Sequence, residues 1–443
     1  MVNPALSRSD AALRRLIRHA CANVPYYRRL FETCGLEPED VQSVSDLRPL
    51  AITTKADLQR EPDEFVARGV NRARLLERIT SGSTGQPASI RNSPFDEFRR
   101  QRARWRVDIG YGVRPGDRRV RFRTPRPLLA GDRILLSVLE STRLYTQRKV
   151  DSRIAGDEAL AILKGFRPTI LDGMTNSIDR AAQAALDAGD ASVRPRYVTT
   201  GGETLTPTMR QRIGEAFAAP IRDVFGTCEL GAIASECPVS GLYHVSPGVA
   251  LEIIGSDGQP ALDGVEGQVV ATSLLSRAVP VIRYGTGDIA VRGPDACPCG
   301  YRGGTLREVR GRIVDVFRLP DGRTLHPWQF PIRSALWIRS FHLVQEREDR
   351  FVLCLVPTPG ASPNDIADGR QAMVDMLGPS VEFSIETVER LDAGPGGKLR
   401  PFQPLGLGTG ARIDSAPRSP LRSDDDESND EDLSKRTSRC VDR

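Results

Sequence analysis

One stretch of this sequence reads Thr80-Ser81-Gly82-Ser83-Thr84-Gly85-Gln86-Pro87, with hydroxyl side chains interleaved between two glycines. Glycines let the backbone turn sharply and approach a ligand closely, and successive N–H groups in such a turn form a concave anion site. A polyphosphate fits that chemistry. The stretch is not a P-loop, because Gln86 follows the second glycine where that motif has lysine. A surface turn rich in small residues is the alternative interpretation.

The sequence around this stretch predicts layered α/β structure. A strand is expected at 75–79, and helices and strands alternate from about 94 to 200. Such alternation favours a largely parallel sheet. The expected elements are helices at 95–110, 157–166 and 177–188, strands at 119–123, 169–172 and 196–200, and a short apolar element at 134–139.

The flanking regions differ in pattern. Apolar residues at helical spacing predict a helix over 9–23, and helix starts are expected at 45–47 and 53–58. Short β-rich runs at 249–254, 267–272 and 288–291 indicate a mostly antiparallel β subdomain. Strand and helix signals at 341–346, 350–356, 363–377 and 381–388 indicate a compact α+β unit, and the tail after about 406 has no apolar face.

We therefore predict the α/β fold class. A large N-terminal region of layered α/β is expected at 1–311, with a β-rich subdomain at about 235–310. A small α+β C-terminal domain follows at 312–405, and a disordered tail at 406–443. A chain of 443 residues is long enough for two or three domains, at roughly 100–200 residues each.

Composition narrows the class of protein. The net charge of +5 is small, and no basic stripe interleaved with aromatic residues indicates a nucleic-acid partner. No run of about 18 apolar residues predicts a membrane span, and residues 1–10 lack the apolar core of a signal peptide. Eight cysteines in such a chain do not suggest a disulfide framework. We expect a cytoplasmic protein that binds neither nucleic acid nor membranes.

Arginine greatly outnumbers lysine in this chain, so each lysine is worth inspecting, because the two side chains differ in chemistry. The lysines are Lys55, Lys149, Lys164, Lys398 and Lys435. Lys398 lies in the glycine-rich stretch 394–400 and has no other lysine between 164 and 435. A compact ammonium in a flexible loop can stabilise developing negative charge, whereas a solvated surface lysine is the alternative.

Several segments, in this order, resemble motifs of the adenylate-forming enzymes, and within them the phenylacetate–CoA ligase-like branch. The resemblance covers roughly residues 10–405. Residues 81–87 resemble the family's phosphate loop S-G-[ST]-T-G-x-P. The other segments are 23–28 and 53–58, similar to N-terminal signatures, 199–203 on the adenine side, 223–229 (D-x-[YF]-G-x-[ST]-E), 284–288 (Y-R-T-G-D), 311–315 (G-R-x-D-D) and 394–400 (G-K-x-R).

The resemblance implies a role for each matched residue. Phe225 would stack on adenine and Glu229 would bind Mg²⁺, which prefers oxygen ligands. Asp288 would hold the ribose hydroxyls, and Lys398 would reach the carboxylate and the α-phosphate. The other nucleotide-binding residues implied are Ser81, Gly82, Ser83, Thr84, Gly85, Gly202, Glu203, Asp223, Gly226, Thr227 and Arg312. Taken singly, these segments could also be ordinary strand ends and polar turns.

Three positions depart from the family pattern. Cys228 replaces a hydroxyl, which puts a contact with the α-phosphate in doubt. Gly285 stands where the family often has arginine, so the role of that arginine is absent or falls to Arg283. Val314 replaces an acidic residue at the expected hinge, and Asp315 is the substitute.

A separate cluster consists of Cys237, His244, Cys297 and Cys299. Sulfur and imidazole ligands in a set of four suit tetrahedral Zn²⁺. Some members of the branch carry a similar pattern at this place. With all four positions filled by protein, the zinc would be structural and would hold two loops together. Unrelated buried cysteines are the alternative.

The function implied by the resemblance is ATP-dependent activation of a carboxylic acid, aryl or arylacetic, as an acyl-adenylate, followed by transfer to a thiol, with coenzyme A expected. The acid pocket would draw on residues 122–145, 199–203 and 225–232. Transfer to an amine or a carrier-protein thiol stays open. A catalytically degenerate, zinc-stabilised scaffold also stays open. The small C-terminal domain would swing between the two half-reactions, and a homodimer is common in the branch.

Overall fold

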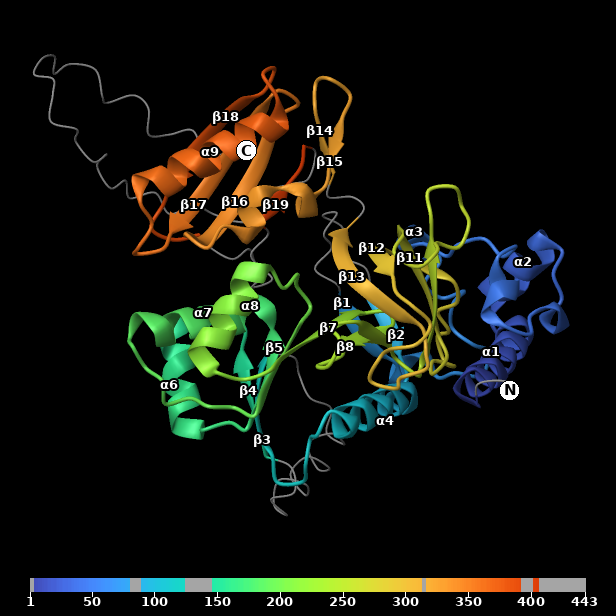
Figure 1. Cartoon of the computed structure of the whole chain (residues 1–443). Coiled ribbons are helices and arrows are strands. Elements are labelled where there is room, and N and C mark those ends of the chain that lie inside the picture. The colour runs from blue at the N-terminus through green and yellow to red at the C-terminus, as the bar shows by residue number, and fades with distance from the viewer. Residues whose placement is uncertain (1–3, 80–88, 124–145, 313–315, 392–400, 406–443) are drawn as a thin grey trace, which may run out of the picture. The chain divides into compact units, whose positions relative to one another are not determined.

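The computed structural model describes residues 4–79, 89–123, 146–312, 316–391 and 401–405 (Figure 1). The chain forms two compact units. The first consists of Met1–Leu205 with Met209–Val314, and the second of Thr206–Thr208 with Asp315–Arg443. The domain that we expect to begin at 312, and its movement, stay predictions. None of the described helices is long and apolar enough to cross a membrane.

The N-terminal segment of the first unit is helical. Helices α1 (Pro4–Asn23), α2 (Pro25–Cys34) and α3 (Lys55–Arg60) confirm the helix expected over 9–23 and the helix start at 53–58. Pro25 ends α1 because it has no backbone N–H, and it takes the first position of α2, where none is needed. Short 3₁₀ turns lie at Pro38–Asp40, Val44–Leu47 and Arg72–Arg74.

One eleven-stranded sheet forms the framework of this unit, in the order β10-β11-β12-β13-β9-β8-β7-β6-β5-β3-β4. Its parallel half confirms the predicted alternation, because parallel strands need crossover connections. The strands are β3 (Arg118–Arg123), β4 (Thr146–Asp151), β5 (Ile170–Met174), β6 (Tyr197–Gly201) and β7 (Ile221–Thr227), and the helices are α4 (Pro94–Gly110), α6 (Gly156–Phe166), α7 (Thr175–Asp187) and α8 (Pro207–Phe217). The apolar element expected at 134–139 lies outside the described residues.

The antiparallel half continues the same sheet. The expected β-rich runs form antiparallel strands, but these strands do not make a separate sheet, because β8 pairs with β7. A sequence pattern shows strands and not their partners, so this continuity was not predictable. The strands are β8 (Gly231–Glu236), β9 (Tyr243–Val245), β10 (Val249–Ile254), β11 (Glu266–Ser273), β12 (Tyr284–Arg292) and β13 (Thr305–Arg312).

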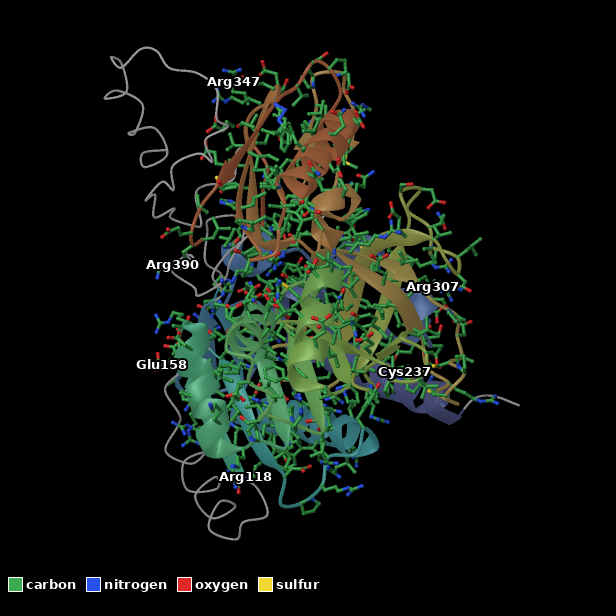
Figure 2. All side chains as sticks on the ribbon, turned by 60° about the vertical axis from the view of Figure 1, so that its left-hand side comes forward. Arg118, Glu158, Cys237, Arg307, Arg347 and Arg390 are labelled. Carbon is green, nitrogen blue, oxygen red and sulfur yellow. The ribbon has the colours of Figure 1, made fainter. Side chains whose placement is uncertain are left out.

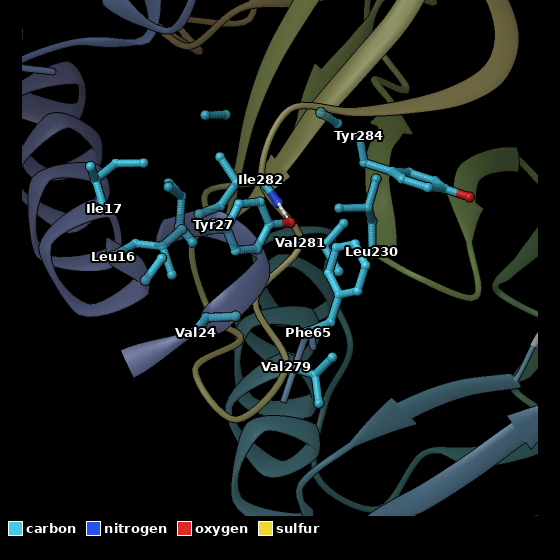
Figure 3. Close-up of a cluster of buried hydrophobic side chains, with 14 of the residues drawn as sticks. Leu16, Ile17, Val24, Tyr27, Phe65, Leu230, Val279, Val281, Ile282 and Tyr284 are labelled. Carbon is cyan, nitrogen blue, oxygen red and sulfur yellow. Dashed lines mark hydrogen bonds between the residues drawn. The ribbon is translucent and has the colours of Figure 1, made fainter. Parts of the chain in front are cut away.

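Among the described residues, the two largest apolar cores of this unit lie on either half of the sheet, and a smaller one lies among the antiparallel strands. One lies between α6, α7, α8 and the parallel strands, and includes Phe122, Leu163 and Phe217. The other joins α1 and α2 to the segment that leads into β12, as Figure 3 shows. In it the fully buried Tyr27 hydroxyl accepts a hydrogen bond from the Ile282 N–H at 2.9 Å. The helical N-terminus is thereby fixed to the strand that carries the Y-G-T-G-D segment.

The face of α4 that packs on the sheet is charged. Asp172 of β5 accepts from Arg121 Nε at 2.7 Å and lies 3.4 Å from Arg104 Nη2. Asp108 of α4 accepts from Arg222 Nη2 at 2.7 Å. Burial alone would raise the pKa of Asp172, but Arg121 and Arg104 outweigh it and hold that pKa well below its usual range. A network of buried ion pairs therefore replaces apolar packing here.

The second unit contains a four-stranded sheet in the order β18-β17-β16-β19 and a β14–β15 hairpin. Phe351, Leu353 and Met373 are among the buried residues of its apolar core. These elements confirm the compact α+β prediction. Their bounds are β14 (Phe317–Arg318), β15 (Thr324–Leu325), β16 (Ile338–Arg347), β17 (Arg350–Pro357), α9 (Pro363–Leu377), β18 (Glu382–Thr387) and β19 (Phe402–Gln403), with 3₁₀ turns at Pro327–Gln329 and Pro331–Ser334.

Candidate functional site

A β-hairpin flanks the expected phosphate loop. Strands β1 (Leu76–Ile79) and β2 (Ser89–Asn92) pair antiparallel, with Ile79 opposite Ser89. The strand expected at 75–79 is confirmed. The loop residues Ser81, Gly82, Ser83, Thr84 and Gly85 lie outside the described residues, so their role stays a prediction. The hairpin nevertheless fixes where the loop begins and ends.

Glu229 lies beside this hairpin. Its side chain lines a pocket with Ser89, Ile90 and Arg91 of β2. It is only 7 % exposed, and its Oε1 accepts a hydrogen bond from the Tyr284 hydroxyl at 3.1 Å. A buried carboxylate with one neutral donor keeps acceptor capacity for a cation. Glu229 therefore lies beside the strand that follows the expected phosphate loop, and its binding of Mg²⁺ stays a prediction.

Lys55 lies within the electrostatic reach of Glu229, and the sequence reasoning assigned it no role. The backbone of Thr53 bridges to β12, since its N–H donates to Arg283 O at 2.9 Å and its carbonyl accepts from Gly285 N–H at 3.0 Å. Thr54 then caps α3, and Lys55 begins that helix. Burial lowers the pKa of Lys55, the negative charge of Glu229 opposes that shift, and Arg312 adds to it. The segment 53–58 was recognised as a signature, and it was the signal that could have found this residue.

Asp288 and Arg312 face each other across β12 and β13. The two residues are paired in register, and Arg312 Nε lies 3.8 Å from Asp288 Oδ1. Asp288 is buried, whereas Arg312 is exposed. The backbone N–H of Asp288 donates to Thr286 Oγ1 at 3.1 Å, and Gly287 between these two residues has φ +76°, which favours glycine. The turn therefore holds the carboxylate in β12, the strand that begins at Tyr284 and to which Thr53, two residues before Lys55, is bridged.

The space around Gly285 is tight. A Cβ at this position would lie 2.9 Å from Gln268 Nε2 and 3.1 Å from Ile52 Cγ2, so a larger residue would require these two side chains to shift. Arg283 does not replace the arginine that the family often has at this position. Its guanidinium is buried and donates to Glu252 at 3.3 Å and to Arg48 O at 2.9 Å. Arg283 therefore ties the N-terminal segment to the sheet.

Asp223 is buried in the sheet rather than open to a ligand. It accepts from Thr200 Oγ1 at 2.7 Å and from the Tyr243 hydroxyl at 2.9 Å. Burial raises the pKa of Asp223 from its ordinary value of 3.8 to about 6, although the two hydroxyls oppose that shift. Through these bonds the carboxyl of Asp223, in β7, is joined to β6 and β9. It therefore positions the rest of the motif at 223–229.

The raised pKa of Asp223 predicts a pH effect on stability. The folded protein holds this proton more tightly, so the contribution is fully present below pH 3.8 and is lost as pH rises to about 6. The loss amounts to about 3 kcal/mol, at about 1.36 kcal/mol per pKa unit. Between pH 3.8 and about pH 6, we expect the free energy of unfolding of wild type to fall by about 3 kcal/mol relative to that of Asp223→Asn. Urea unfolding followed by circular dichroism measures both free energies. The exposed control Asp295→Asn should not change the profile. A constant difference between wild type and Asp223→Asn would contradict the prediction.

The remaining predicted residues occupy positions set by the sheet. Gly226 has no space for a side chain, because a Cβ would lie 2.3 Å from Gly231 O. Glu203 accepts from the Asn176 N–H and from Asn176 Nδ2, both at 3.0 Å, which joins the end of β6 to α7.

Phe225 is half-buried and packs against two apolar clusters. Gly202 has φ +78°, and Thr227 Oγ1 accepts from Leu230 N–H at 3.2 Å. Contact of any of them with a nucleotide stays a prediction.

Some expectations cannot be placed. Lys398, Val314 and Asp315 lie outside the described residues, as does most of the expected acid pocket at 122–145. Cys228 is half-buried against the apolar cluster of α1 and α2. Arg100 of α4 is a further neighbour of Glu229, since its Nη2 donates to the Glu229 carbonyl at 2.7 Å. Sequence reasoning missed it because the two residues are far apart in the chain.

The four predicted zinc ligands come together in the fold. Cys237 follows β8, His244 lies in β9, and Cys297 and Cys299 lie between β12 and β13 (Cys237 is labelled in Figure 2). Their ligand atoms all lie within 4.8 Å of one another. Cys237 Sγ and Cys297 Sγ are 3.8 Å apart, and Cys299 Sγ is 3.5 Å from His244 Nε2. Tetrahedral Zn²⁺ with its usual bond lengths would place two sulfur ligands about 3.8 Å apart, and a sulfur and a nitrogen ligand about 3.5 Å apart. The residues therefore fit this metal.

A second layer of contacts orients these ligands. The hydroxyl of Tyr111, which follows α4, lies 3.3 Å from His244 Nδ1 and leaves Nε2 directed at Cys299. The ring of Tyr301 stacks on His244 at 4.1 Å between centroids. Burial lowers the pKa of His244, which favours the neutral imidazole that binds metals.

Comparison with known proteins adds an independent observation. No protein-family model matches the chain. It is 25 % identical over 335 residues to the phenylacetate-coenzyme A ligase of Thermus thermophilus, covering 72 % of this chain and 73 % of that protein. It is 23 % identical over 399 residues to Protein CapK of Staphylococcus aureus, covering 85 % of this chain and 84 % of that protein. These relatives match in sequence across most of both chains.

The fold has a match among solved structures. A solved structure of 2-hydroxyisobutyryl-CoA ligase with an acyl-AMP matches with a TM-score of 0.71 at 20 % identity, covering 86 % of this chain and 85 % of that one. The chain is a phenylacetate–CoA ligase-like, adenylate-forming protein. In this phenylacetate–CoA ligase-like protein, the negative charges of Glu229 and Asp288 both act on Tyr284, and the charge of Glu229 acts on Lys55. A nucleotide site at these residues stays a prediction.

Proposed function

We propose that this protein activates a carboxylic acid with ATP and transfers the acyl group to coenzyme A. The carboxylate oxygen attacks the α-phosphorus of ATP, the bond to the β-phosphate oxygen breaks, and pyrophosphate leaves. The coenzyme A thiolate then attacks the acyl carbon, and AMP leaves with the bonding electrons. The carboxylate of Glu229 beside the β1–β2 hairpin, within the electrostatic reach of Lys55, is the observation that carries the proposal.

The proposed division of labour follows from the charges. Glu229 would hold Mg²⁺, which neutralises phosphate charge when bound. Asp288 would accept hydrogen bonds from the ribose hydroxyls. Lys55, whose ammonium is attracted by Glu229, would contact the phosphates that leave, and Lys398 would stabilise the α-phosphate during attack. An aryl or arylacetic acid is the substrate class that the relatives suggest, since the first among them are phenylacetate-coenzyme A ligases.

Pyrophosphate exchange into ATP across a panel of acids tests this function. We expect exchange with an aryl or arylacetic acid, loss of exchange in Lys398→Ala, and AMP release that depends on coenzyme A. AMP release with hydroxylamine in place of coenzyme A at equal rate would favour transfer to an amine instead. Absence of exchange with every acid, together with no effect of Lys398→Ala on AMP formation, would leave the scaffold interpretation.

We also propose that Cys237, His244, Cys297 and Cys299 hold a structural Zn²⁺. The metal would close the loop after β8 and the loop between β12 and β13 onto each other. All four ligands come from the protein, so the site has no open position for catalysis. The separations of the sulfur and nitrogen atoms support this proposal.

Removal of the Tyr111 hydroxyl should weaken zinc retention. Tyr111→Phe removes the contact that orients His244, and loss of such a contact costs about 10–100-fold in metal affinity. Zinc content by mass spectrometry and the rate of zinc release to a chromogenic chelator measure the effect. Tyr197→Phe is the matched control, because Tyr197 also lies against Arg222 but does not contact His244. Equal release rates in Tyr111→Phe, Tyr197→Phe and wild type would argue against the assignment.

A further inference from the structure

The parallel half of the sheet has a point at which the order of its strands reverses. From β3 the chain runs to β4 on the outer side, and it then returns to β5 on the other side of β3 and continues to β6 and β7 (Figure 1). Open α/β sheets bind ligands at the carboxyl ends of the two strands that flank such a reversal. The topology therefore directs attention to the ends of β3 and β5.

One face of β3 is basic along the whole strand. Arg119, Arg121 and Arg123 alternate with two residues that pack into the apolar core of α6, α7 and α8. Side chains alternate between the two faces of a strand, so the three arginines lie on the other face. That face lies toward α4, since Arg119 Nη2 donates to Asp108 of α4 at 3.1 Å. We call it the basic face of β3.

The basic face of β3 opens toward the carboxyl end of the strand. Arg119 is 5 % exposed, the side chain of Arg121 is 16 % exposed, and Arg123 is fully among the exposed residues. Lys149 of β4 is exposed and stands beside Arg121 in the register of the sheet, which places it on the same face. The accessible positive charges therefore gather where the strand order reverses.

These positive charges share one carboxylate of β5. Asp172 Oδ2 accepts from Arg121 Nε at 2.7 Å, and it lies 3.4 Å from Arg104 Nη2 and 3.8 Å from Arg119 Nη1. Burial alone would raise the pKa of this carboxyl, but Arg121, Arg104 and Arg123 hold that pKa below its usual range. The charge of Arg123 thus acts on the same group.

The two carboxylates nearest to this group are already engaged. Asp108 bonds Arg222 at 2.7 Å as well as Arg119. Asp151, which stands beside Arg123 in register, bonds Arg153 at 2.6 Å. Positive charge that is partly removed from water is costly unless an anion faces it. An anionic ligand would supply that negative charge at the open end of the basic face.

Helix α4 relates the basic face of β3 to Glu229. Arg100 donates to the Glu229 carbonyl at 2.7 Å, and Arg104, four residues later on the same side of the helix, is the residue beside Asp172. Four residues are about one helical turn, or about 6 Å. An acid with two anionic groups on opposite sides of an aryl ring has a comparable length.

We propose that Arg123 and Lys149 bind a second anionic group of the acid substrate. The substrate class is then an aryl acid with two anionic groups, such as a dicarboxylic acid, of which one carboxylate reacts with ATP. The inference rests on the proposed function for that reaction. A guanidinium and an ammonium group together donate charge-assisted hydrogen bonds to a carboxylate or a sulfonate. Arg121 adds positive charge and keeps its own bond to Asp172.

Pyrophosphate exchange with matched pairs of acids tests this inference. One member of each pair is an aryl or arylacetic acid with a second carboxylate on its ring, and the other has a carboxamide there, with the same shape and no charge. We expect kcat/KM to be about 10- to 100-fold higher for the dicarboxylic member, as for hydrogen bonds to a charged group. Arg123→Gln/Lys149→Gln should abolish this preference by lowering kcat/KM for the dicarboxylic member alone.

Arg148→Gln is the matched control. Arg148 is exposed and precedes Lys149 in β4, but it stands beside Val120 in register and so lies on the opposite face. This variant loses a positive charge from the same strand and should keep the full preference. Equal melting temperatures would show that all variants fold, since the substituted side chains are exposed.

The possible results separate this inference from the proposed function. Equal kcat/KM within every pair, or a preference that survives in Arg123→Gln/Lys149→Gln, would overturn the inference and leave the function standing. Absence of exchange with every acid would overturn the function, and the inference with it. Inhibition by inorganic phosphate or coenzyme A that disappears in the double variant, without any preference between the acids, would assign the basic face to a phosphate group instead.

Discussion

Glu229→Gln is expected to lower ATP–pyrophosphate exchange by about a hundredfold or more. Glutamine keeps the shape of the side chain and an oxygen that can accept from the Tyr284 hydroxyl at 3.1 Å. It loses the negative charge that a Mg²⁺ ligand beside the phosphates supplies. Removal of one preorganised charge-stabilising group in an active site typically costs about 10²–10³ in rate. The measurement is exchange at saturating acid over a range of Mg²⁺ concentrations.

The control for this variant is Tyr284→Phe. It deletes the hydrogen bond and keeps the carboxylate charge, so we expect at most about a tenfold loss, in line with one neutral hydrogen bond. Equal melting temperatures of the two variants and wild type would exclude a folding defect. Exchange by Glu229→Gln within twofold of wild type at saturating Mg²⁺ and ATP would remove Glu229 from the proposed site.

Asp172→Asn is expected to destabilise the protein by about 3–5 kcal/mol. The carboxylate is buried and bonds Arg121 at 2.7 Å, with Arg104 at 3.4 Å. Asparagine would remove the buried negative charge that faces these partly buried guanidinium groups, and removing one partner of a buried pair costs this much. Urea unfolding at neutral pH measures the loss.

The exposed pair of Asp263 and Arg307 gives a matched control. Their atoms lie 2.8 Å apart, but both side chains are close to half exposed. Exposed pairs contribute at most about 1 kcal/mol, so Asp263→Asn should be nearly silent. Equal effects of Asp172→Asn and Asp263→Asn would show that the buried network does not stabilise the fold.

The stability difference between wild type and Asp172→Asn should also depend on pH. The pKa of Asp172 is held below its ordinary value of 3.8, so its contribution is present above that value. It is lost as pH falls through the lower pKa of the folded state. The difference between wild type and Asp172→Asn should therefore shrink below about pH 4, opposite in direction to the effect of Asp223.

The sequence predicted the elements of the fold better than their partners. The periodic segments 9–23 and 363–377 are helices, because an apolar face at a spacing of 3.6 residues is a local property. That β8 pairs with β7, and so joins both halves of the sheet, depends on contacts between separate segments. No local pattern carries that information.

The candidate site divides in the same way. Motif residues such as Glu229 and Asp288 were predicted because glycine and carboxylate spacing is visible in a sequence. Of the two alternatives for the arginine missing at position 285, the contacts favour absence of its role, because the Arg283 guanidinium bonds Glu252 and the Arg48 carbonyl. Lys55 was left without a role because its proximity to Glu229 arises from the bridge between Thr53 and Tyr284.

The sequence by itself determined the α/β class, the order of the motifs, and the set of four soft ligands. These follow from residue type and spacing, which are visible in the sequence without knowledge of the fold. Only the tertiary structure decided which groups meet: the cysteine and histidine ligands within 4.8 Å, and the charged inner face of α4. The basic face of β3 became recognisable only then, since alternation along a strand shows that two faces exist and packing decides what each of them contacts.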